Sequence, residues 1–416
     1  MSISDSLYIG ASGLLAHGNA MSVVGDNIAN ASTIGFKRGR ASFADMLGGE
    51  MVNQRMGGGA YLGHTQTMWA QGSIAQTGNP MDVAITGDGM FVVKGSHGGV
   101  DQTLYSRDGR FQLDNSGFVV DQQGLRVQGY TINADGTRTT DIGDLALGQH
   151  QSPPVATTKA TIDMNLGAND AVGSATPFDP TNPATTSQYQ TSMVVHDSLG
   201  NAHTVQLYFH NNGTGSWDYH AMADGKELTG GTPGTPVEIG TGTLQFDTSG
   251  NLTTQTGSIT ANFVNAGQNQ AIAMDFGKST QTANNDGVTA LTIDGHGSGN
   301  LSSLKIDPDG KVEGVYDNGD KLVLAQIALA KVPNTDGLER MGDGLWSANP
   351  ASGQAIVEAP GIAGRGSLVA GALEASNVDL GTELVTLIAY QRAFQANAKT
   401  VTTADEMLTD VNNIKR

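Results

Sequence analysis

Both ends of the chain carry a seven-residue repeat of large apolar residues, and the middle of the chain has a different pattern. At each end, further seam positions lie between the large residues, and several of them are small. The seam of the N-terminal repeat consists of Leu7, Ala11, Leu14, Gly18, Met21, Gly25 and Ile28. The seam of the C-terminal repeat consists of Leu380, Leu384, Leu387, Phe394, Ala398, Val401 and Leu408. A heptad seam of this kind predicts two amphipathic helices that pack closely against partner helices.

Glycine makes the N-terminal helix marginal on its own. Gly10, Gly13, Gly18 and Gly25 each cost about 1 kcal/mol relative to alanine in a helix interior. Burial of one large seam residue contributes roughly 1.5 to 3 kcal/mol, so packing can offset the glycines. We therefore expect termini that are disordered alone and ordered once packed. The sequence leaves two kinds of partner open, because the helices could form a hairpin within one chain or pack between subunits.

Between the two helices, short apolar runs alternate with glycine-containing turns. Val83 to Ile85 and Met90 to Val93 flank the turn Gly87-Asp88-Gly89, and similar runs return at Lys311 to Tyr316 and Lys321 to Leu329. This spacing is typical of antiparallel β structure. The early and late runs are expected to share one domain.

Residues 150–295 differ from the segments on both sides. They hold 7 of the 12 prolines, and their 3 lysines against 12 acidic residues give a charge of 3 − 12 = −9. Alternating runs such as Gln190 to His196 again indicate strands. We interpret this block as a second β domain inserted into a loop of the first.

The sequence thus predicts a mainly β protein with α-helical termini that pair as a coiled coil, an extended linker region and two antiparallel β domains, the second inserted into the first. The linker segment 33–78 is polar, has Gly57 to Gly59 in a row, and is expected to contain little regular structure. The predicted parts are 1–32 with 372–416 for the helices, 33–78 with 355–371 for the linker, 79–149 with 296–354 for the first β domain, and 150–295 for the insert.

Composition and charge argue against several classes of function. The 22 Lys and Arg against 40 Asp and Glu give 22 − 40 = −18, a charge that repels nucleic acid and anionic membrane surfaces. The absence of cysteine excludes disulfides, cysteine-ligated zinc and thiol nucleophiles. No uninterrupted apolar stretch reaches the roughly 18 residues that indicate membrane insertion. The first basic residue is Lys37, so a cleaved secretory signal is not expected.

The sequence contains no complete motif for a catalytic, cofactor or metal site, and we predict none. Gly277-Lys278-Ser279 ends like a phosphate-binding loop, but Ile272 stands where such a loop requires glycine. His196, His203 and His210 are spaced by seven, which places successive members on opposite faces of strands. These histidines are expected to be surface or half-buried residues, with a metal site as the alternative.

Each helical repeat is joined to a longer motif. At the N-terminus these are Val24 to Asn30, Thr33 to Lys37 and Ala41 to Met46, and at the C-terminus Gly371 to Leu380 and Ala389 to Ala398. They resemble the terminal signatures of the axial proteins of the bacterial flagellum, the rod and hook family. The individual residues taken as family-motif residues are Asn27, Asn30, Gly35, Phe36, Glu374, Asn377 and Val378.

The resemblance extends into the middle of the chain. Asp82 to Ile85 and Tyr105 to Phe111 resemble the first β domain of that family, and His196 to His203 resembles part of the insert that its hook members carry. The resemblance implies a structural subunit, not an enzyme, that polymerises into the short curved tube between rod and filament. Such a tube is a universal joint that transmits motor torque. The terminal helices would pack as a coiled coil in its inner wall, and the β domains would form its outer layers.

The resemblance also implies partners and a location. The partners are further copies of the chain in a helical homopolymer, the distal rod protein, the hook-capping protein, the hook–filament junction protein and the flagellar type III export apparatus. Cofactors, nucleic acid and membrane insertion are not among them. The location is extracellular, in the hook and basal body of the flagellum, after export without a cleaved signal peptide.

Two alternatives remain open from the sequence. Another axial protein, from the distal rod or the hook–filament junction, would share the terminal motifs. A secreted β-rich carbohydrate-active enzyme with helical ends would need two carboxylates in a cleft, about 5 to 9.5 Å apart. No sequence feature points to such a pair.

Overall fold

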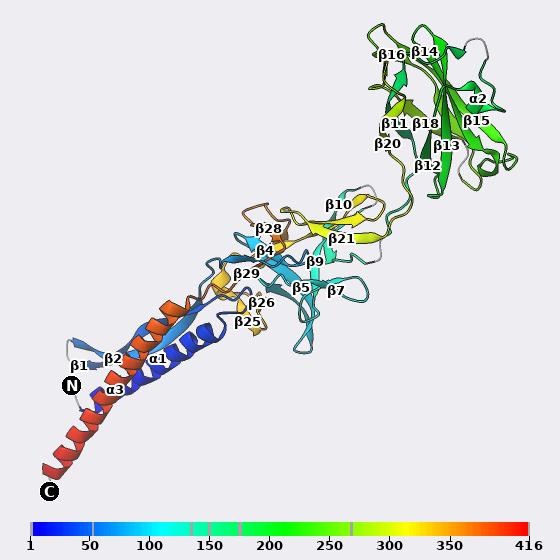
Figure 1. Ribbon diagram of the computed structural model, residues 1–416. Coiled ribbons are helices and arrows are strands. Elements are labelled where there is room, and N and C mark those ends of the chain that lie inside the picture. The colour runs from blue at the N-terminus through cyan, green and yellow to red at the C-terminus, as the bar shows by residue number, and fades with distance from the viewer. Residues whose placement is uncertain are drawn as a thin grey trace. The chain divides into compact units, whose positions relative to one another are not determined.

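The chain folds into two compact units. The computed structural model describes residues 3–51, 54–133, 136–148, 151–173, 177–266 and 269–414. The first unit comprises Met1–Gln149, Ser303–Val315 and Lys321–Arg416, and the second comprises His150–Ser302 and Tyr316–Asp320. The expected class, mainly β with helical ends, is confirmed (Figure 1). Neither long helix in the described part of the chain is long and apolar enough to cross a membrane.

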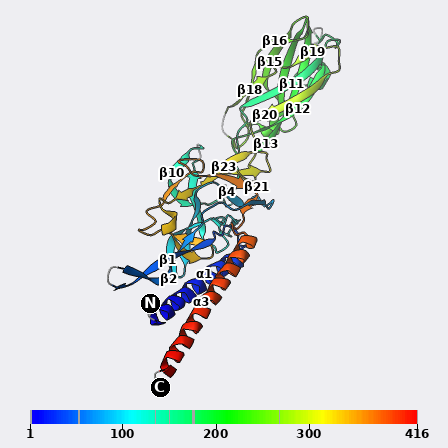
Figure 2. The ribbon, with the colours of Figure 1, turned by 90° about the vertical axis from the view of Figure 1, so that its left-hand side faces the viewer.

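The two terminal helices lie side by side in the first unit. Helix α1 spans Ile3–Ala29 and helix α3 spans Leu380–Ile414, and both views show them paired (Figures 1 and 2). The carboxylate of Asp379 accepts a hydrogen bond of 2.9 Å from the backbone N–H of Thr382, which caps the start of α3.

Glycine allows the two helices to approach closely. A Cβ atom at Gly10 would lie 2.7 Å from Cγ2 of Val401, and one at Gly13 would lie 2.6 Å from Oδ1 of Asn397. Real Cβ atoms do not come so close to such neighbours, so alanine at either position requires α3 or its side chains to move. Gly25 is different, because a Cβ there would meet no atom within 4 Å. Gly10 and Gly13 therefore weaken the isolated helix but are needed for the close packing of α1 on α3.

The expectation of little regular structure in 33–78 was wrong. Strands β1 (Gly39–Met51) and β2 (Gln54–Thr67) form an antiparallel hairpin. The hairpin packs on α1, where the backbone N–H of Ala60 donates to Oγ of Ser12 at 3.2 Å. A Cβ at Gly59 would overlap the Ser12 hydroxyl, so glycine at this position allows β2 to approach α1. Because glycine-rich strands have low intrinsic propensity, these strands are hard to predict from the sequence.

The second part of the expected linker, 355–371, also contains strands. Strand β27 spans Ile356–Glu358 and β28 spans Ser367–Ala370. Strand β28 pairs with β4 (Val83–Thr86), and β29 (Ala372–Glu374) pairs with β3 (Ile74–Gln76). These pairings tie the segment before α3 to the segment after the hairpin.

The main sheet of the first unit draws strands from both sides of the inserted block. Along its longest path the order is β21-β22-β23-β9-β5-β6-β26-β25. The pairing of β9 with β23 joins residues before the insert to residues after it. The bounds are β5 Met90–His97, β6 Val100–Ser106, β7 Gln112–Leu113, β8 Val119–Val120, β9 Arg126–Ile132, β10 Arg138–Asp144, β21 Leu301–Ile306, β22 Lys311–Tyr316, β23 Lys321–Ile327, β24 Leu329–Lys331, β25 Glu339–Gly342 and β26 Leu345–Ser347, with a 3-10 turn at Thr335–Gly337.

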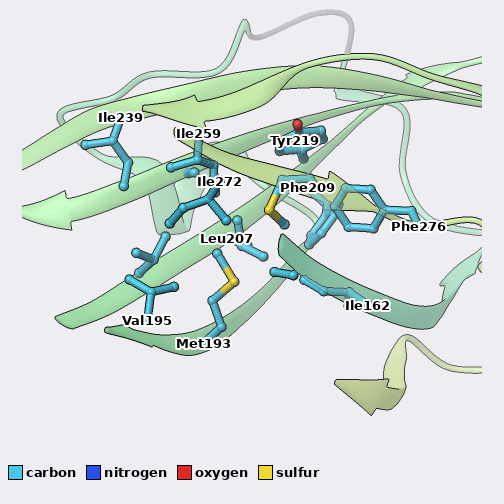
Figure 3. Packing of buried hydrophobic residues seen from close by; sticks show 14 of the residues in the cluster. Ile162, Met193, Val195, Leu207, Phe209, Tyr219, Ile239, Ile259, Ile272 and Phe276 are labelled. Carbon is cyan, nitrogen blue, oxygen red and sulfur yellow. The ribbon is translucent and has the colours of Figure 1, made fainter. Parts of the chain in front are cut away.

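The second unit is built on a ten-stranded sheet around one apolar core. Its main path is β12-β13-β14-β15-β17-β18-β11-β19, and Figure 3 shows the side chains of several of these strands pointing toward one another. The bounds are β11 Lys159–Gly167, β12 Tyr189–His196, β13 Ala202–Gly213, β14 Ser216–Asp224, β15 Pro236–Phe246, β16 Leu252–Gln255, β17 Ser258–Ala261, β18 Gln270–Asp275, β19 Thr280–Thr282 and β20 Gly287–Ile293, with short helical turns at Pro183–Thr186 (α2) and Gly225–Glu227.

The second unit is not purely antiparallel, contrary to expectation. Strand β11 pairs in parallel with β18 and with β19, although most other pairs are antiparallel. Parallel strands need a long connection rather than a hairpin. The chain supplies one, because the strands from β12 to β17 lie between β11 and β18 in the sequence. A local turn pattern could not reveal this pairing.

The close approach at Gly10 generates the first prediction. Gly25→Ala should stabilise helix α1 by about 1 kcal/mol, because alanine favours the helix and meets open space. Gly10→Ala should give no such gain, because its methyl group meets the stiff side chain of Val401. Amide hydrogen exchange within α1 measures both opening free energies. Equal gains from the two variants would contradict the close packing of α1 on α3.

The core of the second unit generates a pH prediction. Tyr219 is fully buried, its hydroxyl has no hydrogen-bond partner among the described residues, and burial raises its pKa to about 12. The unfolded chain ionises this tyrosine near pH 10, so the folded state binds more protons above that pH. Stability should therefore fall by roughly 2 to 3 kcal/mol as the pH rises from about 10 to 12.

The variant Tyr219→Phe should reduce this alkaline loss while changing stability little at neutral pH, because no hydrogen bond is removed. Urea unfolding of the second unit at several pH values provides the measurement. An unchanged slope in the variant would show that other groups cause the alkaline loss.

Candidate functional site: the terminal helices and the buried polar junction

A buried carboxylate joins three segments of the first unit that are far apart in the sequence. Glu374, at the end of β29, is 1% exposed. Its Oε1 accepts hydrogen bonds from Nζ of Lys37 at 2.6 Å and from the backbone N–H of Gly72 at 2.9 Å. Its Oε2 accepts from Nη1 of Arg107 at 3.0 Å. We call Lys37, Arg107 and Glu374 the polar junction.

The polar junction holds two cations on one carboxylate away from water. Lys37 is 2% exposed and Arg107 is 5% exposed. Burial lowers the pKa of the Lys37 ammonium below its usual value, while the hydrogen bond and the charge of Glu374 act in the opposite direction. Carbonyl groups provide the remaining support: Nζ of Lys37 donates to Ala70 O at 3.0 Å, and Nη2 of Arg107 donates to Gly87 O at 2.8 Å.

A second polar group links the two helices to the start of the hairpin. Nδ2 of Asn27 in α1 donates to Oε2 of Glu383 in α3 at 3.1 Å. The same amide exchanges two 2.8 Å hydrogen bonds with the backbone of Gly39. Nη1 of Arg38 then lies 3.1 Å from Oε1 of Glu383. Asn27 and Glu383 are 1% and 4% exposed, so this link is shielded from solvent.

Asn377 and Gly35 complete the connection between the helices and the β structure. Oδ1 of Asn377 accepts from the backbone N–H of Arg38 at 2.8 Å, and Nδ2 donates to Met68 O and Ala70 O at 2.7 and 2.9 Å. The backbone N–H of Gly35 donates to Glu374 O at 2.7 Å. Gly35 has φ +68°, and a Cβ there would lie 2.7 Å from the carbonyl carbon of Arg107. Only glycine fits this position without strain.

The other family-motif residues have more local roles. Nδ2 of Asn30 donates to the backbone carbonyl of Asp26 at 2.9 Å, at the end of α1. Phe36 is buried, and the guanidinium of Arg340 lies 5.2 Å from the centre of its ring. Val378 is half-buried in the turn before α3. Of the seven motif residues, Asn27, Gly35, Glu374 and Asn377 thus hold distant segments together.

The face of α1 that is buried within the chain lies beside the predicted seam and does not coincide with it. The buried positions are Gly10, Gly13, Ala16, Ala20, Val24 and Asn27. On the predicted seam, Leu7, Leu14, Gly18, Met21 and Ile28 are half-buried, and Ala11 and Gly25 are exposed. On α3, four of the seven seam residues are half-buried, namely Leu387, Ala398, Val401 and Leu408. The other three, Leu380, Leu384 and Phe394, are exposed.

Both helices expose large apolar side chains on their outer faces. On α1, Tyr8 and Leu15 are 76% and 71% exposed. On α3, Val385 is 69% exposed, and similar residues recur along the helix. The exposed apolar residues of α3 are Leu380, Leu384, Val385, Ile388, Phe394, Met407 and Val411. We call these outward residues of α1 and α3 the apolar helix surface. Such a concentration is typical of an interaction surface.

Sequence reasoning missed the charged members of these clusters. Lys37, Arg38, Arg107 and Glu383 were not singled out as site residues. The chain has only 22 Lys and Arg in 416 positions. The positions of Lys37, Arg38 and Arg107 close to glycines in the sequence could therefore have marked them as candidate site residues. Their convergence on Glu374 and Glu383 could not be read from the sequence, because the partners are separated by more than 250 residues.

Two of the three evenly spaced histidines are more buried than expected, whereas His196 is half-buried as expected. His203 and His210 are 7% and 3% exposed, so the expectation of surface or half-buried residues was wrong for both. The ring of His203 stacks on Phe263 at 3.8 Å, and its Nε2 lies 3.2 Å from Oδ2 of Asp197. Nδ1 of His210 lies 2.7 Å from Thr186 O. Within the described ranges, no group of three or more acidic, histidine or cysteine side chains could hold a metal ion.

Four protein-family models match consecutive parts of the chain. Residues 7–37 match the model described as "Flagella basal body rod protein", and residues 84–165 match "Flagellar hook protein FlgE/F/G D1 domain". Residues 163–296 match "Flagellar basal body protein FlaE D2 domain", and residues 369–414 match "Flagellar basal body rod FlgEFG protein C-terminal". The third match lies entirely in the second unit.

Relatives with the same printed name match over nearly the whole chain. "Flagellar hook protein FlgE" of Escherichia coli is 36% identical, over 97% of this chain and 98% of that protein. The protein of that name from Salmonella typhimurium is 37% identical over the same shares. The one from Treponema pallidum is 32% identical over 99% of both chains.

The polar junction generates a stability prediction. Glu374→Gln leaves Lys37 and Arg107 buried without a carboxylate, and loss of one partner of a buried ion pair costs about 3 to 5 kcal/mol. Urea unfolding of the first unit should show a loss of this size. Asp88→Asn is the matched control, because Asp88 pairs with Lys331 but is 73% exposed, and such pairs contribute about 0 to 1 kcal/mol. Similar losses in both variants would contradict the special role of Glu374.

Proposed function

The chain belongs to the family of flagellar hook proteins and is a structural subunit of the hook, and we propose that it polymerises through the apolar helix surface. The single observation that carries this proposal is the exposure of large apolar residues on the outer faces of both α1 and α3. These helices already bury one face against each other. Further apolar side chains on the same helix pair are therefore available to neighbouring copies.

The predicted seam fits this division of the helix surface. Ala11 and Gly25 on α1, and Leu380, Leu384 and Phe394 on α3, remain exposed in the single chain. Burial of such residues between copies would supply roughly 1.5 to 3 kcal/mol for each large side chain. The sequence left open whether the helices pack within one chain or between subunits. In this proposal both occur, because some residues of each helix form the intramolecular pair and others form the contacts between subunits.

We further propose that the polar junction makes the helices and the first β structure one mechanical element. Hydrogen bonds that Asn27 donates and that Asn377 and Glu374 accept join α1, α3 and the β segments around them. Torque applied to the helices would then pass to the β structure through buried, charge-assisted contacts that resist rearrangement. The second unit would contribute outer contacts that re-form as the tube turns, because its surface is acidic and rich in glycine and threonine.

The more specific partners and the export route are also proposals. Family membership supports contact with the distal rod protein, the hook-capping protein and the hook–filament junction protein at the ends of the polymer. It likewise supports passage through the flagellar type III export apparatus without a cleaved signal peptide. The relatives carry the hook name along 97% or more of this chain, which favours the hook over the distal rod or the junction.

We propose no enzymatic activity. The buried carboxylates have structural partners: Glu374 holds Lys37 and Arg107, and Glu383 holds Asn27 and Arg38. In the second unit, Asp197 accepts hydrogen bonds from the backbone of its own turn. Glu374, Glu383 and Asp197 are therefore not free to act as the carboxylate pair of a carbohydrate-active enzyme.

Immunogold electron microscopy of sheared cell-surface appendages tests the proposal. With the wild-type chain, antibody label should be confined to short curved segments between rod and filament. Val385→Asp should remove this label, because it places a charge on the apolar helix surface, while the chain is still exported to the medium. Val100→Asp is the matched control, because Val100 is a 59% exposed valine of the first unit outside both helices.

Three results would contradict the proposal. Label on the straight rod or on the junction would assign the chain to another axial position. Normal labelling with Val385→Asp would exclude the apolar helix surface as the contact between copies. Loss of labelling with Val100→Asp would show that any added charge on the first unit blocks assembly, and that the helices are not special.

A further inference from the structure

His203 is a buried ring held between two carboxylates of the second unit. It lies in β13 and is 7% exposed. Its Nε2 lies 3.2 Å from Oδ2 of Asp197, which follows β12, and its Nδ1 lies 3.4 Å from Oε2 of Glu227, in the short turn Gly225–Glu227. One face of the ring stacks on Phe263. We call Asp197, His203 and Glu227 the histidine clamp.

Asp197 determines that Nε2 of the ring carries a proton. The side chain of Asp197 is fully buried, and it accepts hydrogen bonds from the backbone N–H groups of Leu199 and Asn201 and from Nδ2 of Asn201, at 2.8 to 2.9 Å. Burial opposes ionisation of this carboxyl, but the hydrogen bonds from Asn201 and His203 outweigh burial and lower the pKa of Asp197. An ionised carboxylate can only accept hydrogen bonds. The ring nitrogen that faces it is therefore a donor.

The other ring nitrogen also faces a carboxylate. Nδ1 of His203 and Oε2 of Glu227 are both shielded from water, and neither has a hydrogen-bond partner among the described residues. Without a proton on Nδ1, two acceptors would face each other at 3.4 Å in the interior, which is unfavourable. A proton on Nδ1 turns the same contact into an attraction between opposite charges. The stacked ring of Phe263 favours this form as well, because an aromatic face attracts a cation.

The other neighbours of the ring add no charge that would oppose this form. His203 lies opposite Val195 of β12 in the strand pair, and Val195 is apolar. Lys226 precedes Glu227, but its Nζ pairs with Asp224 at 3.6 Å. The ring is therefore faced by two carboxylates, an aromatic ring and an apolar strand. Two nearby negative charges favour the charged form of a histidine.

We propose that His203 is an imidazolium held by Asp197 and Glu227, and that its second proton makes the stability of the second unit depend on pH near neutrality. The histidine clamp joins the turn after β12, strand β13 and the turn Gly225–Glu227. The proposal goes beyond the proposed function, because it concerns a single chain and does not require polymerisation. It also differs from the effect of Tyr219, which appears only above about pH 10.

The sign of the effect follows from where the proton is lost. A histidine in the unfolded chain releases its second proton near pH 6.5, whereas the folded unit retains it in the clamp. Below that pH both states hold the proton and the clamp contributes its full stability. As the pH rises, the unfolded state binds fewer protons than the folded state, so unfolding becomes easier.

The first test reads the protons directly in the full chain. Nitrogen NMR of the His203 ring at pH 7.5, assigned by the signals lost in His203→Gln, should show a proton on both nitrogens. In Glu227→Gln the new amide can donate to Nδ1, so the ring should carry a proton on Nε2 alone. Asp224→Asn is the matched control, because it removes a carboxylate just before the same turn and keeps a capping side chain. It should leave both protons in place. A bare Nδ1 in the wild-type chain would overturn the proposal.

The second test measures the linkage to stability. Urea unfolding of the second unit in the full chain is followed by the indole signal of Trp217, which is fully buried in the core of that unit. Between pH 7 and pH 8, the unfolding equilibrium constant should rise about tenfold more for the wild-type chain than for Glu227→Gln, as expected for one proton. Asp224→Asn should behave like the wild-type chain. Equal pH dependence in the wild-type chain and Glu227→Gln would show that the clamp holds no such proton, and would overturn the proposal even if all variants fold.

Discussion

The first unit depends on one buried carboxylate that serves two buried cations. Glu374 holds Lys37 and Arg107 at 2.6 and 3.0 Å, and its removal would leave two cations in the interior without a carboxylate. Lys37 comes from the segment between α1 and β1, Arg107 from the segment after β6, and Glu374 from β29, the strand before α3. The orientation of both helices relative to the β structure therefore follows from where these charges can meet.

The helix pair satisfies two requirements that conflict in most helices. Close approach needs glycine, and Gly10 and Gly13 lie where Val401 and Asn397 leave no room for a methyl group. Helix stability disfavours glycine. The chain resolves this conflict by packing, since Ala16, Ala20 and Val24 continue the buried face. The apolar helix surface remains exposed in the single chain, and we propose that contacts between subunits in the polymer bury it.

The two units are stabilised by different kinds of contact. The second unit has a conventional apolar core between strands, with Phe209, Tyr219 and Phe276 in ring contact (Figure 3). The first unit combines an apolar sheet core with buried ion pairs and amide bridges at the base of the helices. Apolar contacts are non-directional, whereas charge-assisted hydrogen bonds fix geometry. This difference fits our proposal that the first unit transmits force and the second forms renewable outer contacts.

The sequence by itself determined the helical ends, the mainly β middle and the change of composition near residue 150. These features follow from local periodicity, turn residues and charge, which each segment carries without reference to the rest. It also marked Glu374, Asn377, Asn27 and Gly35 through their resemblance to a family motif. It did not reveal the β1–β2 hairpin, because glycine-rich strands have low intrinsic propensity and the contacts of the hairpin with α1 are tertiary. Only the tertiary structure decided which face of α1 is buried, that β11 pairs in parallel with β18 and β19, and that Lys37 and Arg107 converge on one carboxylate. Each of these depends on contacts between residues that are distant along the chain, and no local pattern records the free energy of such contacts.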